Sequence, residues 1–211
     1  GAEFFPALLT AINEARQEVH LESYIFEDDD TGRAVSRALA AAARRGIVVR
    51  LMVDGFGAPA FASTLMPDLL DAGVLAVIYR PDIARFRLRR HRLRRLHRKL
   101  AVIDGKIAFV GGINIIDDLN SPDQSPARYD YAVRIEGPLL VPIVHTMRRL
   151  WEIVAWVNLK RRHRIVQRTA PDASPRGQQT AAFLVRDNIR HRRDIEKAYL
   201  SAIGSAHDQI L

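Results

Sequence analysis

Apolar positions along the first 160 residues follow two different periods. Helical spacing of apolar residues is found in four segments, residues 5–19, 33–45, 64–72 and 138 to about 157. Short β-branched or alternating runs lie between these segments and predict strands at residues 20–26, 47–53, 74–79, 100–103, 107–110 and 128–135. Helices that alternate with short strands are typical of an α/β fold. We therefore expect a mixed, mostly parallel β-sheet with helices on both faces.

A change of composition divides the chain after the last of these helices. Residues 160–181 begin with a run of basic residues and continue with Pro, Ser and Gly, which is typical of a linker. Residues 198–211 resemble residues 7–20, with five identities in fourteen positions at an offset of 191 residues. We interpret the chain as one lobe (1–159), a linker (160–181) and the truncated beginning of a second lobe (182–211).

The positive charge of the chain is concentrated in one segment. The net charge is +8, and residues 85–99 contain eight Arg, one Lys and no acidic residue. Outside this segment 23 basic residues stand against 24 acidic ones, so the rest of the chain is nearly neutral. A basic segment of this kind suits either anionic lipid headgroups or a nucleic-acid backbone. The chain has no Cys, which excludes disulfides and thiolate metal sites, and no apolar run long enough to span a membrane.

The basic segment ends in a pattern that can bind phosphate. His97 and Lys99 lie two residues apart on an extended chain, so both side chains point to one face at the entrance of the apolar strand 100–103. Asp104 and Gly105 then form a turn to the next strand. Gly111 and Gly112 end that strand where the backbone must approach another group closely, and the amide of Asn114 follows. An imidazole, an ammonium group and an amide thus gather beside a glycine turn.

The spacing His-x-Lys, four residues, Asp, six residues, Gly-Gly-x-Asn resembles the signature of the phospholipase D superfamily. The stretches 21–32, 53–55, 97–105 and 129–138 are similar to its bacterial cardiolipin synthase branch, although Arg128-Tyr129-Asp130 departs from the usual Trp-Arg-Asp. Two-lobed members carry one His-Lys-Asp motif in each lobe. The resemblance implies phosphatidyl transfer between phospholipids through a phosphohistidine, with this chain supplying one of two motifs.

The resemblance also implies roles for individual residues. His97 would be one of two imidazoles, the nucleophile or the general acid, and the sequence does not distinguish the two roles. Lys99 and Asn114 would bind the phosphate oxygens, and no metal or other cofactor is needed. Asp104 belongs to the signature, but its turn position leaves two interpretations equally open: contact with the substrate, or a bond to backbone or Lys. Asp130 would orient the imidazole, whereas Glu22 is not assigned to the site.

Expected partners are anionic phospholipids, namely phosphatidylglycerol and cardiolipin, and a second lobe in cis or by dimerisation. The expected location is the cytoplasmic side of the bacterial inner membrane, with peripheral attachment. One alternative is a metal-independent phosphodiesterase, nuclease or phospholipase D that acts as a dimer of single-motif lobes. Another is an inactive lobe that binds anionic surfaces. Nucleic acid is the less favoured partner.

Overall fold

The computed structural model describes residues 1–80, 95–117, 129–158, 169–186 and 191–210. The chain divides into two compact units, Gly1–Arg176 and Gly177–Leu211. Helices of the first unit are α1 (Phe4–Glu14), α2 (Asp30–Arg44), α3 (Met66–Asp71) and α4 (Leu140–Val157). Its strands are β1 (Glu18–Ser23), β2 (Val48–Asp54), β3 (Leu75–Tyr79), β4 (Leu100–Ile103), β5 (Ile107–Gly111) and β6 (Ala132–Ile135).

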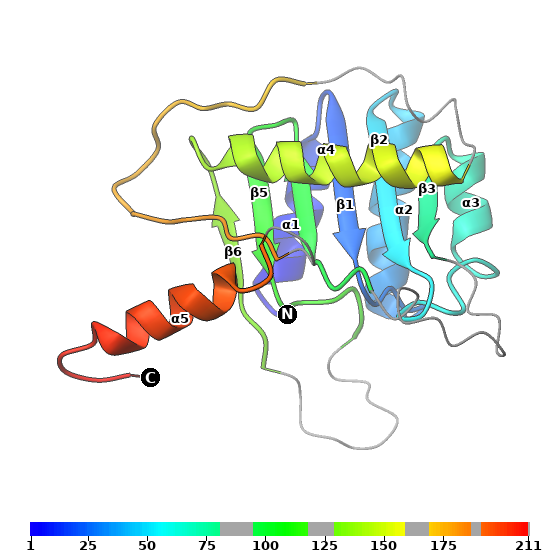
Figure 1. The fold of residues 1–211 in the computed structure, drawn as a ribbon. Helices are drawn as coiled ribbons and strands as arrows, with labels where there is room; N and C mark the ends of the chain where they lie inside the picture. The colour runs from blue at the N-terminus through cyan, green and yellow to red at the C-terminus, as the bar shows by residue number, and fades with distance from the viewer. Residues whose placement is uncertain (81–94, 118–128, 159–168, 187–190, 211) are drawn as a thin grey trace, which may run out of the picture. The chain divides into compact units, whose positions relative to one another are not determined.

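Within these described residues the strands form one six-stranded sheet in the order β3-β2-β1-β4-β5-β6 (Figure 1). Parallel pairing joins β1 to β2 and β2 to β3, whereas β1–β4, β4–β5 and β5–β6 are antiparallel. The predicted α/β class and mixed sheet are therefore confirmed, but the expectation of a mostly parallel sheet was wrong. The Asp104-Gly105 turn is too short for a crossover, so β4 and β5 form a hairpin and reverse the direction of the sheet.

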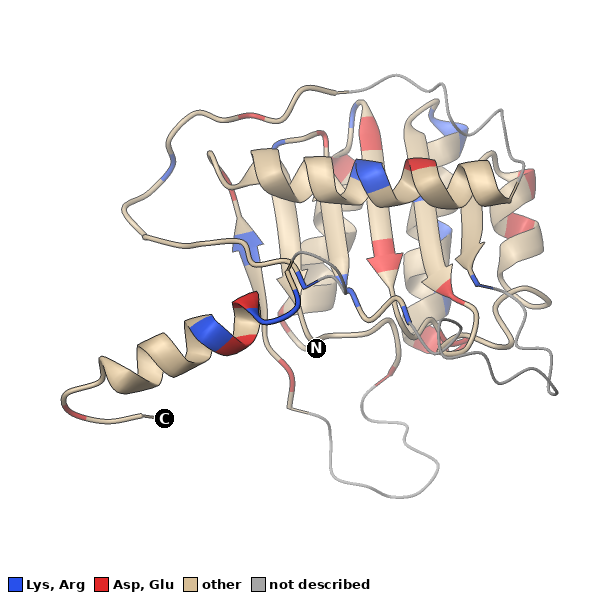
Figure 2. Ribbon diagram, in the orientation of Figure 1, with Lys and Arg blue, Asp and Glu red and all other residues tan. Residues whose placement is uncertain are grey.

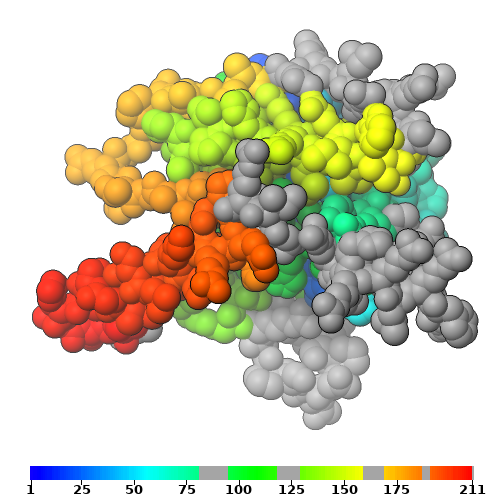
Figure 3. Space-filling view, viewed as in Figure 1, coloured from blue at the N-terminus to red at the C-terminus, as the bar shows by residue number. Residues whose placement is uncertain are grey.

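Helices cover both faces of the sheet, as predicted. One face packs on α1, α2 and α3 over a large apolar core that includes Leu8, Ile12, Leu39, Leu51 and Phe109. The other face is crossed by α4, which packs Trp151, Val154 and Ala155 on Met52 and Val77. In Figure 3 the side chains of α4 fill a continuous band across this face. Because both faces are covered, the polar chemistry is left to the edges where strands begin and end.

Boundaries of the first elements differ from the sequence prediction by up to five residues, the largest difference being the end of α1 at Glu14 rather than at residue 19. β1 begins at Glu18 rather than at residue 20, because its parallel pairing with β2 starts at the pair Glu18–Val48. α2 begins at Asp30 and is capped by Asp29, whose Oδ1 accepts a hydrogen bond from the Gly32 N–H at 2.8 Å. Tertiary pairing and a side-chain cap set these boundaries.

Part of the expected linker belongs to the first unit, which extends to Arg176. The Asp172 N–H donates to the Gly105 carbonyl at 2.8 Å, and the Arg148 guanidinium donates to the Thr169 carbonyl. Residues 160–168 of the linker lie outside the described residues. The second unit contains α5 (Asp194–Gly204), which overlaps residues 198–211, the segment whose sequence resembles residues 7–20.

Candidate active site at the edge of the sheet

The strand directions bring the motif residues other than Asp104 to one edge of the sheet. β1, β2 and β3 end at this edge, and the antiparallel β4 begins there, directly after His97 and Lys99. β5 ends at the same edge with Gly111, and β6 begins there after Asp130. Residues that are separated by more than 30 positions are thus neighbours in space. This is the edge at which open α/β sheets commonly bind ligands.

Tyr24, which follows β1, lies between the two basic side chains of the motif. The His97 ring is exposed, and its centroid lies 4.8 Å from that of Tyr24 at an interplanar angle of 51°. The Lys99 Nζ atom lies 5.1 Å from the same ring centroid and donates to the His97 carbonyl at 3.3 Å. The ring is thus a shared support for the imidazole and the ammonium group. Sequence analysis did not select Tyr24, because an aromatic residue at the end of a strand also suits the core.

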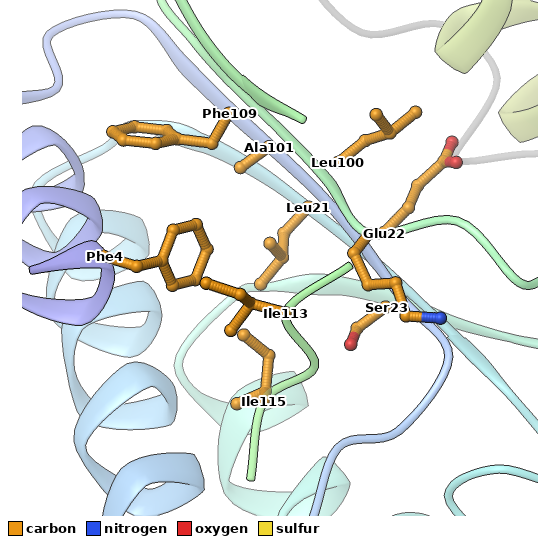
Figure 4. A pocket seen from close by; sticks show the side chains of 10 residues that line it. Phe4, Leu21, Glu22, Ser23, Leu100, Ala101, Phe109, Ile113 and Ile115 are labelled. Carbon is orange, nitrogen blue, oxygen red and sulfur yellow. The ribbon is translucent and has the colours of Figure 1, made fainter. Parts of the chain in front are cut away.

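Burial of Lys99 changes its chemistry. Its side chain is 9% exposed and lines a cavity of about 10 Å³ together with Leu21, Phe109 and Ile113 (Figure 4). Burial among these apolar groups lowers the pKa of Lys99 to about 8, although the Asp130 carboxylate favours the charged form. Lys99 therefore remains mainly protonated at neutral pH, in a weakly solvated position that strengthens its attraction for an anion.

The electrostatic surroundings keep His97 neutral at neutral pH. Burial and the nearby Lys99 charge lower the pKa of His97, and the carboxylates of Asp54 and Asp130 oppose this shift. A neutral imidazole has a lone pair with which it can attack phosphorus or accept a proton. The site thus combines a potential nucleophile with a cation that can bind the charge it generates.

Two glycines allow β5 to end in close contact with the beginning of β6. A Cβ atom on Gly111 would lie 2.3 Å from the Tyr131 carbonyl oxygen, and one on Gly112 would lie 2.6 Å from Asp130 Oδ1. The Gly112 N–H also donates to the Tyr131 carbonyl at 2.7 Å. The close approach inferred from the Gly-Gly sequence is therefore to the β6 backbone and to the Asp130 carboxylate. Asp130 itself is exposed, and its carboxylate lies close enough to influence the protonation of both His97 and Lys99.

Asn114 is fixed against the loop that follows β1. Its Oδ1 atom accepts a hydrogen bond from the Ile25 N–H at 3.1 Å, and the next residue, Ile115, forms a parallel bridge with Phe26. Since the amide oxygen is used in this way, the NH2 group is the part of Asn114 that can donate to a ligand. The loop after β5 and the loop after β1 thus hold each other next to Tyr24.

Asp104 lies at the opposite end of β4 from the basic pair. Four strand residues separate it from Lys99, which corresponds to about 17 Å at ~3.3 Å per residue. Its carboxylate accepts the N–H groups of Arg16, Gln17 and Glu18 at 2.8–2.9 Å. Of the two interpretations open from the sequence, this geometry corresponds to a bond with backbone. Asp104 connects the turn after β4 to the beginning of β1.

A row of polar side chains from β1 lies beneath α4, behind the site. Glu18 forms ion pairs with Arg50 at 2.9 Å and with Arg148 of α4 at 2.6 Å. Figure 2 shows acidic stretches of β1 above and below the point where α4 crosses this strand, and α4 carries a basic stretch at the crossing. Glu22, at the other end of the row, is 0% exposed, and neither of its oxygens accepts a hydrogen bond from a described residue. Among the described residues its nearest cation is Arg98, whose Nη1 atom lies 3.8 Å from Glu22 Oε2, which is too long for a hydrogen bond.

Burial has opposite effects on the two titratable groups at this end of the row. It raises the pKa of Glu22 to about 7, against the attraction of Arg98. Burial, with the charges of Arg50 and Arg148, lowers the pKa of His20 to about 3. The unfavourable burial of charge is the cause in both cases. Arg98 lies between His97 and Lys99 in the sequence, so the ion pair of Glu22 with Arg98 connects the buried polar row of β1 to the motif.

Comparison with known proteins assigns the family. A family model described as "Cardiolipin synthase, PLD-like domain" matches residues 8–149. The chain belongs to this family. Over its whole length it is 36% identical to cardiolipin synthase B of Salmonella typhimurium and 34% identical to cardiolipin synthase B of Escherichia coli K12. In both cases the match covers 50% of the relative, so the chain spans about half the length of these proteins.

More distant relatives of this cardiolipin synthase-like chain agree in family or in fold. Cardiolipin synthase 1 of Bacillus cereus is 32% identical over 66% of the chain, which is 28% of that protein. Two solved structures share the fold: Nuc from Salmonella typhimurium, described as a phospholipase D family member, and NucT from Helicobacter pylori. Their TM-scores are 0.52 and 0.53 at 18% and 20% identity, over 70% and 72% of this chain and 86% and 89% of theirs.

The described residues of the chain show neither a candidate metal site nor a membrane-spanning helix. Among the residues that the structure describes, no group of three or more His, Cys, Asp or Glu side chains could hold a metal ion. In the same residues, no helix is long and apolar enough to cross a membrane. Most of the basic segment, residues 85–94, lies outside the described residues, which include only its last members, Arg95, Arg98 and Lys99.

Proposed function

We propose that this chain provides one half of an active site for phosphatidyl transfer between phospholipids. The observation that carries the proposal is the grouping of a neutral, exposed His97 with a buried, protonated Lys99 and the Asn114 amide at one edge of the sheet. Membership of the cardiolipin synthase family gives the substrate class. Because the chain spans half of its relatives, the activity belongs to a larger assembly of which this lobe is a part.

The reaction needs two imidazoles. In the first step one imidazole nitrogen attacks the phosphodiester phosphorus, a phosphohistidine forms, and the leaving alkoxide takes a proton from the second imidazole. In the second step that imidazole takes the proton of the acceptor hydroxyl, whose oxygen displaces the histidine and completes the transfer. His97 supplies one of the two imidazoles and is suited to the nucleophilic role by its neutrality.

The remaining motif residues bind charge or hold position. Lys99 and the Asn114 NH2 group bind the non-bridging phosphate oxygens, whose charge grows as the phosphorus becomes five-coordinate. Asp130 lies within electrostatic reach of both His97 and Lys99, and its carboxylate stabilises the imidazolium form of His97. In this proposal Asp104 acts on the site only through the position of β4, since its carboxylate is used by three backbone amides.

The second imidazole comes from a second lobe, and α5 supports that proposal. The helix begins at Asp194, one residue from the position that the 191-residue offset predicts from the start of α1 at Phe4. In α1, Leu8 and Ile12 are 0% exposed, whereas their counterparts in α5, Tyr199 and Ile203, are 67% and 51% exposed. An apolar stripe of this kind is expected to pack on a sheet. We therefore infer that residues 182–211 begin a lobe like the first.

The partners follow from the same chemistry. Anionic phospholipids, with phosphatidylglycerol as donor or acceptor and cardiolipin as product, are the proposed substrates. The basic residues 85–99 would hold the lobe against an anionic membrane surface, which corresponds to peripheral attachment at the cytoplasmic side of the inner membrane. The alternative, a metal-independent phosphodiesterase or nuclease acting as a dimer of single lobes, uses the same half-site with another substrate.

Lipid turnover tests the proposal directly. The natural protein that contains this chain, mixed with vesicles of phosphatidylglycerol, should produce cardiolipin that mass spectrometry detects. His97→Ala should abolish the product, and His145→Ala, which changes an exposed histidine of α4, should not. Acid-labile phosphate on His97 would identify it as the nucleophile. Cleavage of DNA without metal and without lipid turnover would instead establish the phosphodiesterase, and vesicle binding with neither reaction would establish an inactive binding lobe.

A further inference from the structure

Asp54, the last residue of β2, is a buried carboxylate to which no role has yet been given. It is 0% exposed. Its Oδ1 atom accepts hydrogen bonds from the N–H groups of Phe56 at 2.9 Å and Gly57 at 3.2 Å, and its Oδ2 atom accepts one from Leu96 at 2.7 Å. A buried charge of this kind is stable only with such a set of donors, so the carboxylate and the three amides hold each other in place.

One of these bonds fixes the backbone directly before His97. Leu96 is 3% exposed and packs with Met52 and Val77 beneath α4, so both its amide and its side chain are held. Beyond it the next side chain is the exposed His97, and β4 begins only at Leu100. The hydrogen bond from the Leu96 N–H to Asp54 therefore ties this segment to the end of β2, and the Lys99 carbonyl, which accepts from the Gly111 N–H at 3.2 Å, ties it to β5 just before the ladder of β4 starts.

The other two bonds act on His97 through Tyr24. They shape the turn that carries Gly57, where an added Cβ atom would lie 2.9 Å from two carbon atoms of the Tyr24 ring. The turn therefore packs tightly on one side of that ring. The ring in turn contacts His97, at 4.8 Å between centroids, and Lys99 Nζ, at 5.1 Å from its centroid. One carboxylate thus reaches the catalytic imidazole by two routes, through its backbone and through its aromatic support.

We propose that Asp54 is a positioning residue for His97: it fixes the imidazole in the orientation for attack on phosphorus by holding the Leu96 amide and the turn against Tyr24. The reaction named here rests on the proposed function, but the geometry does not. Displacement of a reacting group by about 1 Å can cost on the order of 100-fold in rate. The charge of Asp54 acts in the same direction, because it raises the pKa of His97 and so favours the imidazolium that forms when His97 bonds to phosphorus or gains a proton.

A matched pair of substitutions tests this role. Asp54→Asn and Asp104→Asn each change a buried carboxylate that accepts three backbone amides, at opposite edges of the same sheet. In Asp54→Asn an NH2 group replaces one acceptor, so at least one of the three N–H groups loses its partner. The His97 ring-proton signals and their nuclear Overhauser contacts with Tyr24, measured by NMR in this 211-residue chain, report the orientation without any need for turnover.

We expect Asp54→Asn to weaken the Tyr24–His97 contacts and shift the His97 signals, and to lower kcat roughly 10- to 100-fold with KM nearly unchanged. Asp104→Asn should destabilise the fold while leaving the His97 signals at their wild-type positions. Unchanged His97 signals and contacts in a folded Asp54→Asn chain would overturn the proposal. If that variant does not fold, Tyr24→Leu tests the second route, with Tyr24→Phe as its control. Loss of the defined His97 orientation in Tyr24→Leu but not in Tyr24→Phe supports the proposal. An unchanged His97 orientation in both variants overturns it.

The two proposals fail in different ways. A wild-type protein that makes no cardiolipin, with His97 signals that still depend on Asp54, would refute the substrate and leave the positioning role intact. If the wild-type protein makes cardiolipin and the Asp54→Asn variant makes it at the same rate, the positioning role is refuted and the proposed substrate is left intact.

Discussion

The two ends of β4 carry the charged residues of one sequence motif and use them differently. At the beginning of the strand, Lys99 directs its ammonium group to the edge where His97, Asn114 and Asp130 gather. At its end, the carboxylate of Asp104 is consumed by the amides of Arg16, Gln17 and Glu18. The comparison teaches that residues of one motif at fixed spacing can divide between chemistry and architecture. It also predicts that substitutions at the two ends change different measured quantities.

The largest effect on activity is expected at the beginning of the strand. Lys99→Met keeps the length of the side chain but removes the charge proposed to bind the phosphate oxygens, so kcat/KM should fall about 100- to 1000-fold. The unfolding temperature should not decrease, because the lost ammonium group is a desolvated one. Lipid turnover and thermal unfolding, measured on the same samples, check both statements. Lys106→Met, an exposed lysine at the opposite end of β4, is the matched control. An equal loss in both variants would contradict the comparison.

Asp104→Asn should show the opposite pattern. Replacing one carboxylate oxygen by an NH2 group leaves at least one buried amide without an acceptor, which should cost about 2–3 kcal/mol of unfolding free energy. Chemical denaturation measures this loss, and Asp71→Asn, at an exposed position of α3, should stay within about 0.5 kcal/mol of the wild type. A folded Asp104→Asn protein of normal stability that has lost its turnover would show that Asp104 belongs to the chemistry after all.

Glu22 sharpens the comparison because it is close to the site and yet buried. Its pKa rises from 4.5 to about 7 on folding, so between these pH values the folded state holds a proton that the unfolded state has released. Stability therefore falls as pH rises through this window, by on the order of 3 kcal/mol in all. The pKa of His20, lowered to about 3, produces the opposite slope below pH 6.5 and partly masks the effect.

The variant Glu22→Gln isolates this contribution, since a neutral amide does not titrate. Its unfolding temperature should equal that of the wild type near pH 4.5 and exceed it at pH 8, with the His20 contribution common to both proteins. A gap that is independent of pH would mean that Arg98, 3.8 Å away, keeps Glu22 ionised throughout.

The smallest effects are expected at the two glycines. Gly112→Ala displaces the carboxyl group of Asp130, which is the end of a flexible side chain, so we expect roughly a tenfold loss of kcat with little loss of stability. Gly111→Ala meets the rigid Tyr131 carbonyl and the Ala132 backbone instead, so it should lower the unfolding temperature. Thermal unfolding and turnover of both variants separate the two outcomes. Equal loss of stability would show that Gly112, like Gly111, serves only the packing of β5 on β6.

Much of this molecule could be predicted from local pattern. Apolar periodicity located each element of the first unit to within a few residues, and the motif spacing predicted the roles proposed here for His97, Lys99 and Asn114. Prediction from local pattern failed for features that depend on a residue or strand far away in the sequence. The mostly parallel sheet was one such error, because strand direction depends on which strands become neighbours. Tyr24 and Asp54 were missed for the same reason, although an Asp directly after an apolar strand, as in Val53-Asp54-Gly55, is itself a signal for the edge of a sheet.

The sequence by itself determined the family and the α/β class and selected the candidate reactive groups, because these depend on residue types and on spacing along one chain. Only the tertiary structure decided what each group does in its surroundings. Burial, and not spacing, lowers the pKa of Lys99 to about 8. The carboxylate of Asp104 accepts three backbone N–H groups because the chain before β1 lies next to the end of β4. Strand order, and not sequence distance, places Asp54 and Tyr24 behind His97. Desolvation and contact are properties of the folded arrangement, so they arise only when remote segments meet.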